Sequence, residues 1–181
     1  VLMRLLPLLL LLLAGCLPKQ GPVVLEAAAP ITVALVYDAA GSGAPEGLPE
    51  GLQEALLGEL RARNLEPTLV GEAELIDAFG RRRATGQRLA WLQERSPGHV
   101  LLLEAQVGYY NQMNGLWRWT VSFHATAAGP EGGSVDQAFE VPVFLRFHHD
   151  REPQALDAAT DVARARVGRL IDSVLRASEG E

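Results

Sequence analysis

Residues 100–127 read VLLLEAQVGYYNQMNGLWRWTVSFHATA, and this stretch predicts two antiparallel β-strands joined by a tight turn. In both halves apolar side chains recur at odd-numbered positions, so the odd residues should share one face of the sheet. Because faces must agree across an antiparallel pair, two opposed residues should both be odd or both be even. A strict two-residue turn at Asn114-Gly115 would oppose an odd residue to an even one. We therefore expect an odd-length loop or a β-bulge there, with Gly115 at positive φ.

The flanking sequence supplies the rest of one sheet and the helices that cover it. Residues 31–37 are a continuous apolar, β-branched run, which is typical of a strand buried on both faces. The remaining expected elements are a helix from 49 to 63, a strand at 65–70, helices at 72–82 and 85–95, a strand at 134–147 and a helix at 153–177. The order β-α-β-α-α-β-β-β-α predicts an α/β (α+β) fold. We expect a single five-stranded mixed sheet, with helices mainly on the odd face and a more polar opposite face.

The start of the chain is typical of a targeting segment. Arg4 precedes an apolar run from Leu5 to Leu13, which is too short to span a bilayer and has the proportions of a signal peptide. The sequence Leu13-Ala14-Gly15-Cys16 then resembles the lipobox of bacterial lipoproteins at all four positions. This resemblance implies that residues 1–15 are removed and that Cys16 carries the acyl chains that hold the protein to the bilayer. Leu17, where an aspartate would indicate retention, resembles the pattern sent to the periplasmic face of the outer membrane, with the inner membrane as the alternative.

The mature chain is then expected to have two parts, a lipidated cysteine with a short tether at 16–29 and a periplasmic α/β domain at 30–178. Thirteen tether residues span at most about 43–47 Å when fully extended. Loss of Arg4 leaves 15 basic residues against 22 acidic ones, a net charge of −7. This balance excludes a general nucleic-acid binder, and it predicts that the anchor rather than a basic patch holds the protein to its membrane.

The order of elements resembles a periplasmic architecture shared by the TolB amino-terminal domain, CsgG-type secretion lipoproteins and LpoB-type activators of penicillin-binding proteins. The passage from Leu89-Ala90-Trp91-Leu92 into residues 99–104 carries the closest likeness, and the whole resemblance covers residues 31–175. The chain departs from two of these families. It has no spare pair of alternating segments for a CsgG-type pore, and its tether is short where LpoB-type activators have a long arm.

Catalytic motifs are absent from the sequence. No Gly-x-Ser-x-Gly elbow occurs, and the single cysteine is assigned to the anchor, so we expect no enzyme, no cofactor and no metal. The run His148-His149-Asp150 has the residue types of a metal site, but adjacent strand residues point to opposite faces and a solvated turn is the expected outcome. An alternative is a site on the even face, where Glu104, His124 and Glu140 would act in acid–base chemistry or ligate zinc.

A second alternative is a small-ligand or peptidoglycan-binding protein that uses the loop Gly41-Ser42-Gly43. This loop is not a phosphate loop, because no Gly-Lys-(Ser/Thr) follows it.

The aromatic turn region is the preferred contact site. Trp117 and Trp119 lie on the odd face and are expected in the core, whereas Tyr110, Met113 and Leu116 near the turn have less reason to be buried. The sequence therefore favours a membrane-anchored, non-catalytic adaptor or accessory subunit of a cell-envelope machine. Candidate machines serve cell-wall synthesis, outer-membrane assembly or secretion and transport, and we expect an envelope protein as partner.

Overall fold

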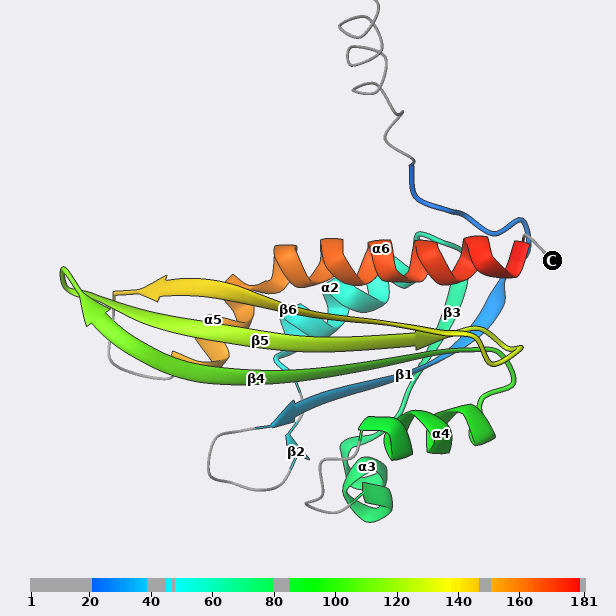
Figure 1. Ribbon diagram of the computed structural model, residues 1–181, viewed down its shortest axis with the longest axis horizontal. Helices are drawn as coiled ribbons and strands as arrows, with labels where there is room; N and C mark the ends of the chain where they lie inside the picture. The colour runs from blue at the N-terminus through cyan, green and yellow to red at the C-terminus, as the bar shows by residue number, and fades with distance from the viewer. Residues whose placement is uncertain (1–20, 39–44, 47, 80–84, 147–150, 180–181) are drawn as a thin grey trace, which may run out of the picture.

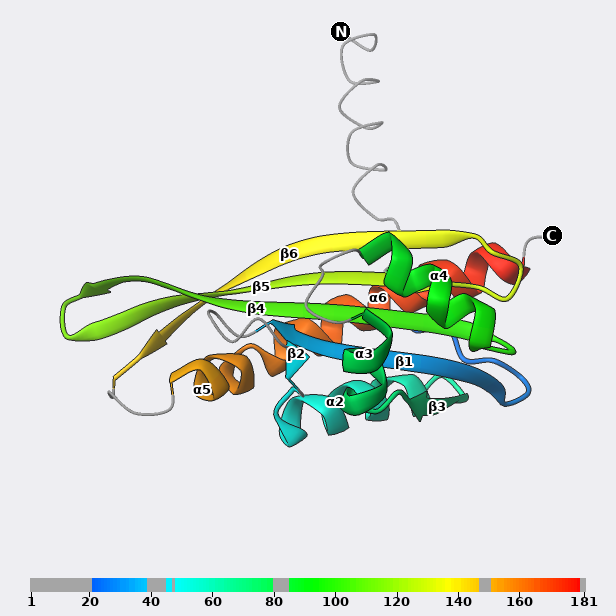
Figure 2. The same cartoon turned by 90° about the horizontal axis from the view of Figure 1, so that it is seen from below.

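One mixed β-sheet separates two layers of helices (Figure 1 and Figure 2). The computed structural model describes residues 21–38, 45–46, 48–79, 85–146 and 151–179. No helix in these ranges is both long enough and apolar enough to span a bilayer.

The strands occupy five positions across the sheet. They are β1 (Ala29–Asp38), β2 (Pro45–Glu46), β3 (Leu65–Leu69), β4 (His99–Met113), β5 (Leu116–Ala128) and β6 (Ser134–Leu145). β4 runs parallel to β1, and β4, β5 and β6 form an antiparallel meander. The parallel β3 and the two-residue β2 pair with successive parts of the other edge of β1. The predicted five-stranded mixed sheet is confirmed. The two-residue β2 is a short addition that pairs with the same edge of β1 as β3 does.

The helices are α2 (Glu50–Arg61), α3 (Glu72–Phe79), α4 (Thr85–Arg95), α5 (Arg151–Ala158) and α6 (Thr160–Glu179). The single helix predicted at 153–177 is wrong, because the chain turns at Ala159 between α5 and α6. The backbone N–H of Ala159 is shared between the carbonyls of Ala155 and Leu156, at 3.1 Å each. The turn lets α5 pack on β4, β5 and β6 while α6 also packs against α2.

Both faces of β1 are buried, as its uninterrupted apolar sequence predicts. Its odd residues Val33 and Leu35 belong to the main core under α2, α5 and α6. Its even residues Ala34 and Val36 belong to a smaller cluster that also contains Leu75 of α3 and Leu92 of α4. Helices thus lie mainly on the odd face. On the even face, α3 and α4 pack on β1 and the start of β4, and α4 extends across the neighbouring strands at one end of the sheet (Figure 2).

The turn between β4 and β5 has two residues, Asn114 and Gly115, both with positive φ (52° and 76°). Met113 therefore pairs with Leu116, which are of opposite parity. A register shift at Tyr110 restores the parity, so that the odd residues of both strands face the core. The predicted bulge and the positive φ of Gly115 are confirmed, and the bulge lies within β4 rather than in the turn.

The described part of the segment expected as a short tether contacts the domain. The N–H of Val23 donates to Asp172 Oδ1 at 3.0 Å, and the N–H of Leu25 donates to the carbonyl of Arg63 at 3.2 Å. Asn64 Nδ2 in turn donates to the carbonyl of Leu25 at 3.1 Å. The described part of this segment is therefore held against the domain by hydrogen bonds.

Candidate functional site

Several residues singled out from the sequence lie outside the described residues. They are Cys16, the loop Gly41-Ser42-Gly43 and the run His148-His149-Asp150. The backbone of Met113 is described as the last residue of β4, but its side chain is not. The candidate surfaces are therefore built from the meander β4–β6 and the helices around it.

The even face of the meander beyond α4 is what we call the open sheet face (Figure 2). Its residues are Gln106, Gly108, Tyr110, Arg118, Thr120, Ser122, His124, Ala138, Glu140, Pro142 and Phe144. They are exposed or half-buried, in contrast to the odd residues of β4 and β5 that face the core. The predicted contrast between an apolar odd face and a more polar even face is confirmed in this region.

Near the turn, the open sheet face carries an aromatic row across three strands. The guanidinium carbon of Arg118 on β5 lies 4.5 Å from the ring centroid of Tyr110 on β4, which is cation–π geometry. Arg118 also pairs across the sheet with Phe144 on β6. Tyr110 is 63% exposed and Phe144 52%, so two aromatic rings flank a partly buried cation at the free end of the sheet.

The odd side of the same end is also aromatic. The Tyr109 ring lies 5.5 Å from the Trp117 ring and 5.4 Å from the Trp119 ring. Trp119 is buried and Trp117 is half-buried against the main core, so the core placement predicted for both tryptophans is confirmed. Tyr109 remains 49% exposed, and Leu116 at the turn is half-buried. This end of the β4–β5 hairpin thus presents apolar surface on both sides of the sheet. We call it the hairpin end, and its residues are Tyr109, Tyr110, Leu116, Arg118 and Phe144.

Three buried polar atoms at this end lack a hydrogen-bond partner among the described residues. They are Asn111 Oδ1, Arg118 Nε and Trp119 Nε1. A buried polar atom without a partner costs about 1–3 kcal/mol. The hairpin end therefore has spare donors and an acceptor beside its exposed rings.

A second cluster lies where α4 meets the open sheet face. Glu104 of β4 is buried, and its Oε1 accepts a hydrogen bond from Arg88 Nη1 of α4. Its Oε2 accepts from Thr85 Oγ1 at 2.6 Å and lies 3.5 Å from His124 Nδ1. His124 Nε2 is 3.8 Å from Asp136 Oδ2 on β6. The structure thus brings Glu104 and His124 together, as the acid–base alternative requires.

This cluster has only part of what chemistry would need. It borders a cavity of about 270 Å³ that Gln106 and Ser122 also line. Glu140 is not among the lining residues; it lies beside a separate hollow of about 470 Å³ near Tyr110. Within the described residues, no three His, Cys, Asp or Glu side chains are placed to hold a metal ion. Both oxygens of Glu104 are engaged, so the arrangement is suited to fastening α4 onto the sheet.

Arg88 is the residue of this cluster that sequence reasoning missed. It is 2% exposed although arginine is rarely buried without a partner. One signal was available, because Arg88 precedes the core residue Leu92 by four positions and so shares its face of α4. Its partner Glu104 is on the next strand, and the sequence alone does not show that pairing.

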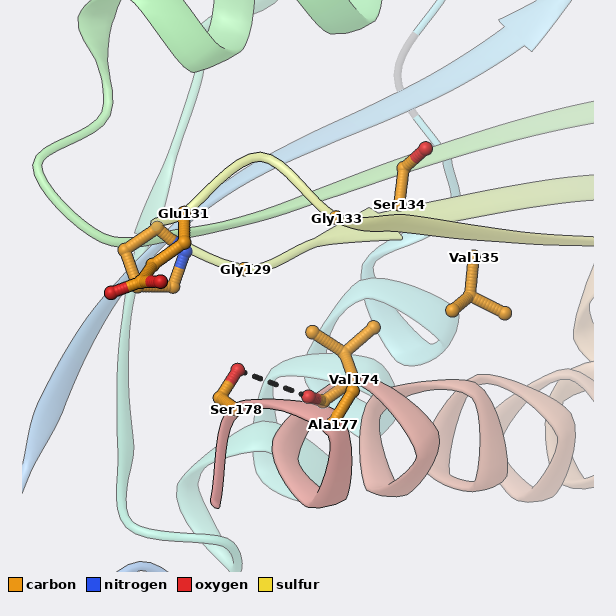
Figure 3. Close-up of a pocket in the computed structure, with 9 residues that line it drawn as sticks. Gly129, Glu131, Gly133, Ser134, Val135, Val174, Ala177 and Ser178 are labelled. Carbon is orange, nitrogen blue, oxygen red and sulfur yellow. Dashed lines mark hydrogen bonds between the residues drawn. The ribbon is translucent and has the colours of Figure 1, made fainter. Parts of the chain in front are cut away.

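A further hollow lies between the β5–β6 loop and the last turns of α6 (Figure 3). It has a volume of about 670 Å³ and is lined by Val135, Val174 and Ala177 together with loop residues 129–131, 133 and 134. Glu131 is the one charged residue of its lining, and the hydroxyl of Ser178 donates to the carbonyl of Val174 at 3.1 Å (Figure 3).

No protein-family model matches the chain, and no curated protein does. Solved structures with a similar course of the chain include a protein of family DUF330 from Xanthomonas campestris, with 12% identity, 89% of this chain and 93% of that chain covered, and a TM-score of 0.48. Lipoprotein GNA1162 from Neisseria meningitidis is 14% identical, covers 77% of this chain and 99% of its own, and has a TM-score of 0.43. A minor lipoprotein from Acinetobacter baumannii is 8% identical over 80% and 92% of the two chains, with a TM-score of 0.42. At these values the likenesses support no statement about the function of this chain.

Proposed function

We propose that this chain is a lipid-anchored periplasmic lipoprotein that acts as a non-catalytic accessory subunit of an envelope machine. In this proposal it binds another envelope protein through the hairpin end. The observation that carries the proposal is that Tyr109, Tyr110 and Phe144, the three aromatic side chains among the exposed large hydrophobic residues of the described chain, all lie at that one end. Exposed apolar residues that cluster at one place indicate an interaction surface, whereas scattered ones do not.

The chemistry of the hairpin end is that of a protein interface. Tyr, Phe and Arg are enriched in interfaces, and Tyr and Arg in particular recur at positions that dominate the binding energy. Arg118 already lies against the Tyr110 ring, so its side chain is ordered before binding and little rotamer entropy remains to be lost. The spare hydrogen-bonding atoms nearby give a partner the opportunity to satisfy them after small side-chain rearrangements.

The anchor is the second part of the proposal. The resemblance of residues 13–16 to a lipobox implies acylation at Cys16, and Leu17 favours the outer membrane over the inner one. Stable attachment to a bilayer needs more than one acyl chain, which lipoprotein processing supplies.

Crosslinking in native envelopes, followed by mass spectrometry of the proteins that co-purify, tests the partner. The variant Tyr110→Glu/Phe144→Glu should lose the partner, because two charges are placed in the aromatic row. Leu69→Glu is the matched control. Leu69 is also an exposed apolar residue, but it lies on β3, which pairs with β1 at the edge of the sheet away from β6. Cys16→Ala reports whether the complex depends on the anchor. Retention of every partner by the Tyr110/Phe144 variant contradicts the assignment of the hairpin end.

The cavity beside Glu104 and His124 supports a second candidate function, the binding of a small polar ligand. The specific observation is the 3.5 Å approach of His124 to Glu104 at the edge of that cavity. A ligand held there would raise the melting temperature of the protein, and His124→Ala would abolish that increase. A screen of periplasmic small molecules that gives no shift would leave the accessory role as the sole proposal.

A further inference from the structure

The outer surface of α6 concentrates positive charge in an acidic chain. Six positions along the outer side of this helix form what we call the α6 stripe: Val162, Ala165, Arg166, Arg169, Ser173 and Arg176. At its edge toward β6, the guanidinium carbon of Arg166 lies 5.9 Å from the ring centroid of Phe139. All six positions are exposed except the half-buried Arg176. The stripe therefore has three arginines and no carboxylate, although the whole chain has a formal net charge of −6.

The carboxylates of α6 whose side chains are described do not neutralise the stripe. Asp172 is buried toward α2, where it accepts a hydrogen bond from Arg63 Nε at 2.8 Å. Asp161 lies 3.9 Å from Arg164, which itself binds Glu59 of α2 at 2.9 Å. These carboxylates are held within the domain by Arg63 and Arg164, and Arg166 and Arg169 of the stripe remain exposed.

The start of the described chain is tied to the same helix. Arg176 Nη2 donates to the carbonyl of Gly21 at 3.0 Å, and the N–H of Val23 donates to Asp172 Oδ1 at 3.0 Å. Figure 1 shows this segment leaving from the α6 side of the sheet, opposite α3 and α4. Five residue steps separate Gly21 from Cys16, which is at most about 17–18 Å of extended chain.

We propose that the α6 stripe faces the membrane and binds anionic lipid headgroups, so that the open sheet face points away from the bilayer. This inference rests on the proposed acylation of Cys16. A linker this short keeps Arg176 close to the bilayer, and the attraction of a cation to an anionic surface extends over a Debye length of about 8 Å at physiological salt. Each arginine near such a surface raises the binding constant for the membrane roughly fivefold. From the net charge alone we expected no basic patch to hold the protein to its membrane. The net charge sums over all faces of the domain, so it does not show that one face is basic.

The orientation is testable with the mature lipidated protein in vesicles of phosphatidylcholine with phosphatidylglycerol. Acylated Cys16 has no free thiol, so a fluorophore reacts only with a cysteine introduced at Ala165 in the stripe or, as the control, at Ala138 on the open sheet face. Both alanines are exposed. With a quencher attached to lipid headgroups, the Ala165→Cys label should be quenched several-fold more strongly than the Ala138→Cys label.

Charge reversal separates a specific orientation from simple proximity. Arg166→Glu/Arg169→Glu should bring the two labels toward equal quenching, whereas Arg166→Lys/Arg169→Lys should retain the difference. Vesicles of phosphatidylcholine alone should reduce the difference as well. One outcome overturns the orientation alone: mass spectrometry shows that Cys16 is acylated, yet both labels are quenched equally in the protein that keeps Arg166 and Arg169. A wild-type Cys16 that reacts with the fluorophore overturns the anchor, and the two failures are thereby distinguished.

Discussion

The buried pair Arg88–Glu104 gives the sharpest test of whether the α4 cluster is structural or functional. Side chains of the two residues are 2% and 9% exposed, so removal of either partner leaves a charge with little access to water. Arg88→Met leaves the Glu104 carboxylate with Thr85 as its remaining close donor. Loss of one partner of a buried ion pair costs about 3–5 kcal/mol. This is a large part of the 5–15 kcal/mol that typically separates folded from unfolded domains.

The double variant Arg88→Met/Glu104→Leu removes both charges together. Replacement of a buried pair by apolar residues of similar volume is often neutral or stabilising. We therefore expect the double variant to be about as stable as the wild type, although each single variant is much weaker. Urea unfolding followed by circular dichroism measures this cycle. With a slope of about 2 kcal/mol per molar urea, each single variant should unfold at a midpoint lower by about 2 M.

The cycle also bears on function. If the pair only fastens α4 to the sheet, the double variant should retain the envelope partner and its response to any ligand of the neighbouring cavity. Single variants that are as stable as the wild type would refute the reasoning, because they would show that the charges are hydrated. A stable double variant that loses a ligand would instead place Glu104 in a binding site.

Three further predictions concern positions where the backbone or burial sets the outcome. Gly98→Ala should destabilise the domain by about 1–3 kcal/mol, because the added Cβ would lie 2.4 Å from the carbonyl oxygen of Pro30. Its matched control is Gly58→Ala in α2, which has open space around it and should stabilise the domain by about 0.5–1 kcal/mol. Thermal unfolding compares the two variants. Gly115→Ala should cost about 1–2 kcal/mol, since φ is +76° in the turn, and an unchanged melting temperature would contradict the left-handed conformation. Burial lowers the pKa of His99 from its ordinary value of 6.5, so the unfolded chain binds the proton first. Stability should therefore fall as the pH drops below about 6.5, and His99→Gln should flatten that part of a pH series of urea unfolding curves.

Local periodicity predicted most of the elements but not their ends. The two-residue period of the meander identified the core face. The parity argument predicted an odd-length loop or a bulge, and the structure has a bulge at Tyr110. The continuous helical pattern of 153–177 concealed the turn at Ala159, because a run of apolar residues at helical spacing is compatible with one helix or two. Whether the segment folds as one helix or as two depends on the elements against which it packs.

For the candidate site, the sequence identified the residue types and the structure selected among them. Exposed Tyr110 was expected at the contact surface, but Phe144 was not, since only the pairing of β5 with β6 brings it beside Arg118. Glu104, His124 and Glu140 shared a face by parity alone, and parity does not distinguish the two that meet from the one that lies apart.

The sequence by itself determined the features that depend on neighbours along the chain: the order of elements, the odd core face, the need for an odd-length loop or a bulge, and the lipobox pattern. The tertiary structure alone decided the features that join distant segments. Arg88 finds its partner 16 residues away, and Val23 binds Asp172 at a separation of 149 residues. The physical reason is that hydrogen bonds and ion pairs form between groups that packing brings within about 3 Å, and no periodicity along the chain encodes which distant groups those are. The same reason explains why an acidic chain can have a basic stripe on α6, because net charge is a sum over residues whereas a surface is made by the fold.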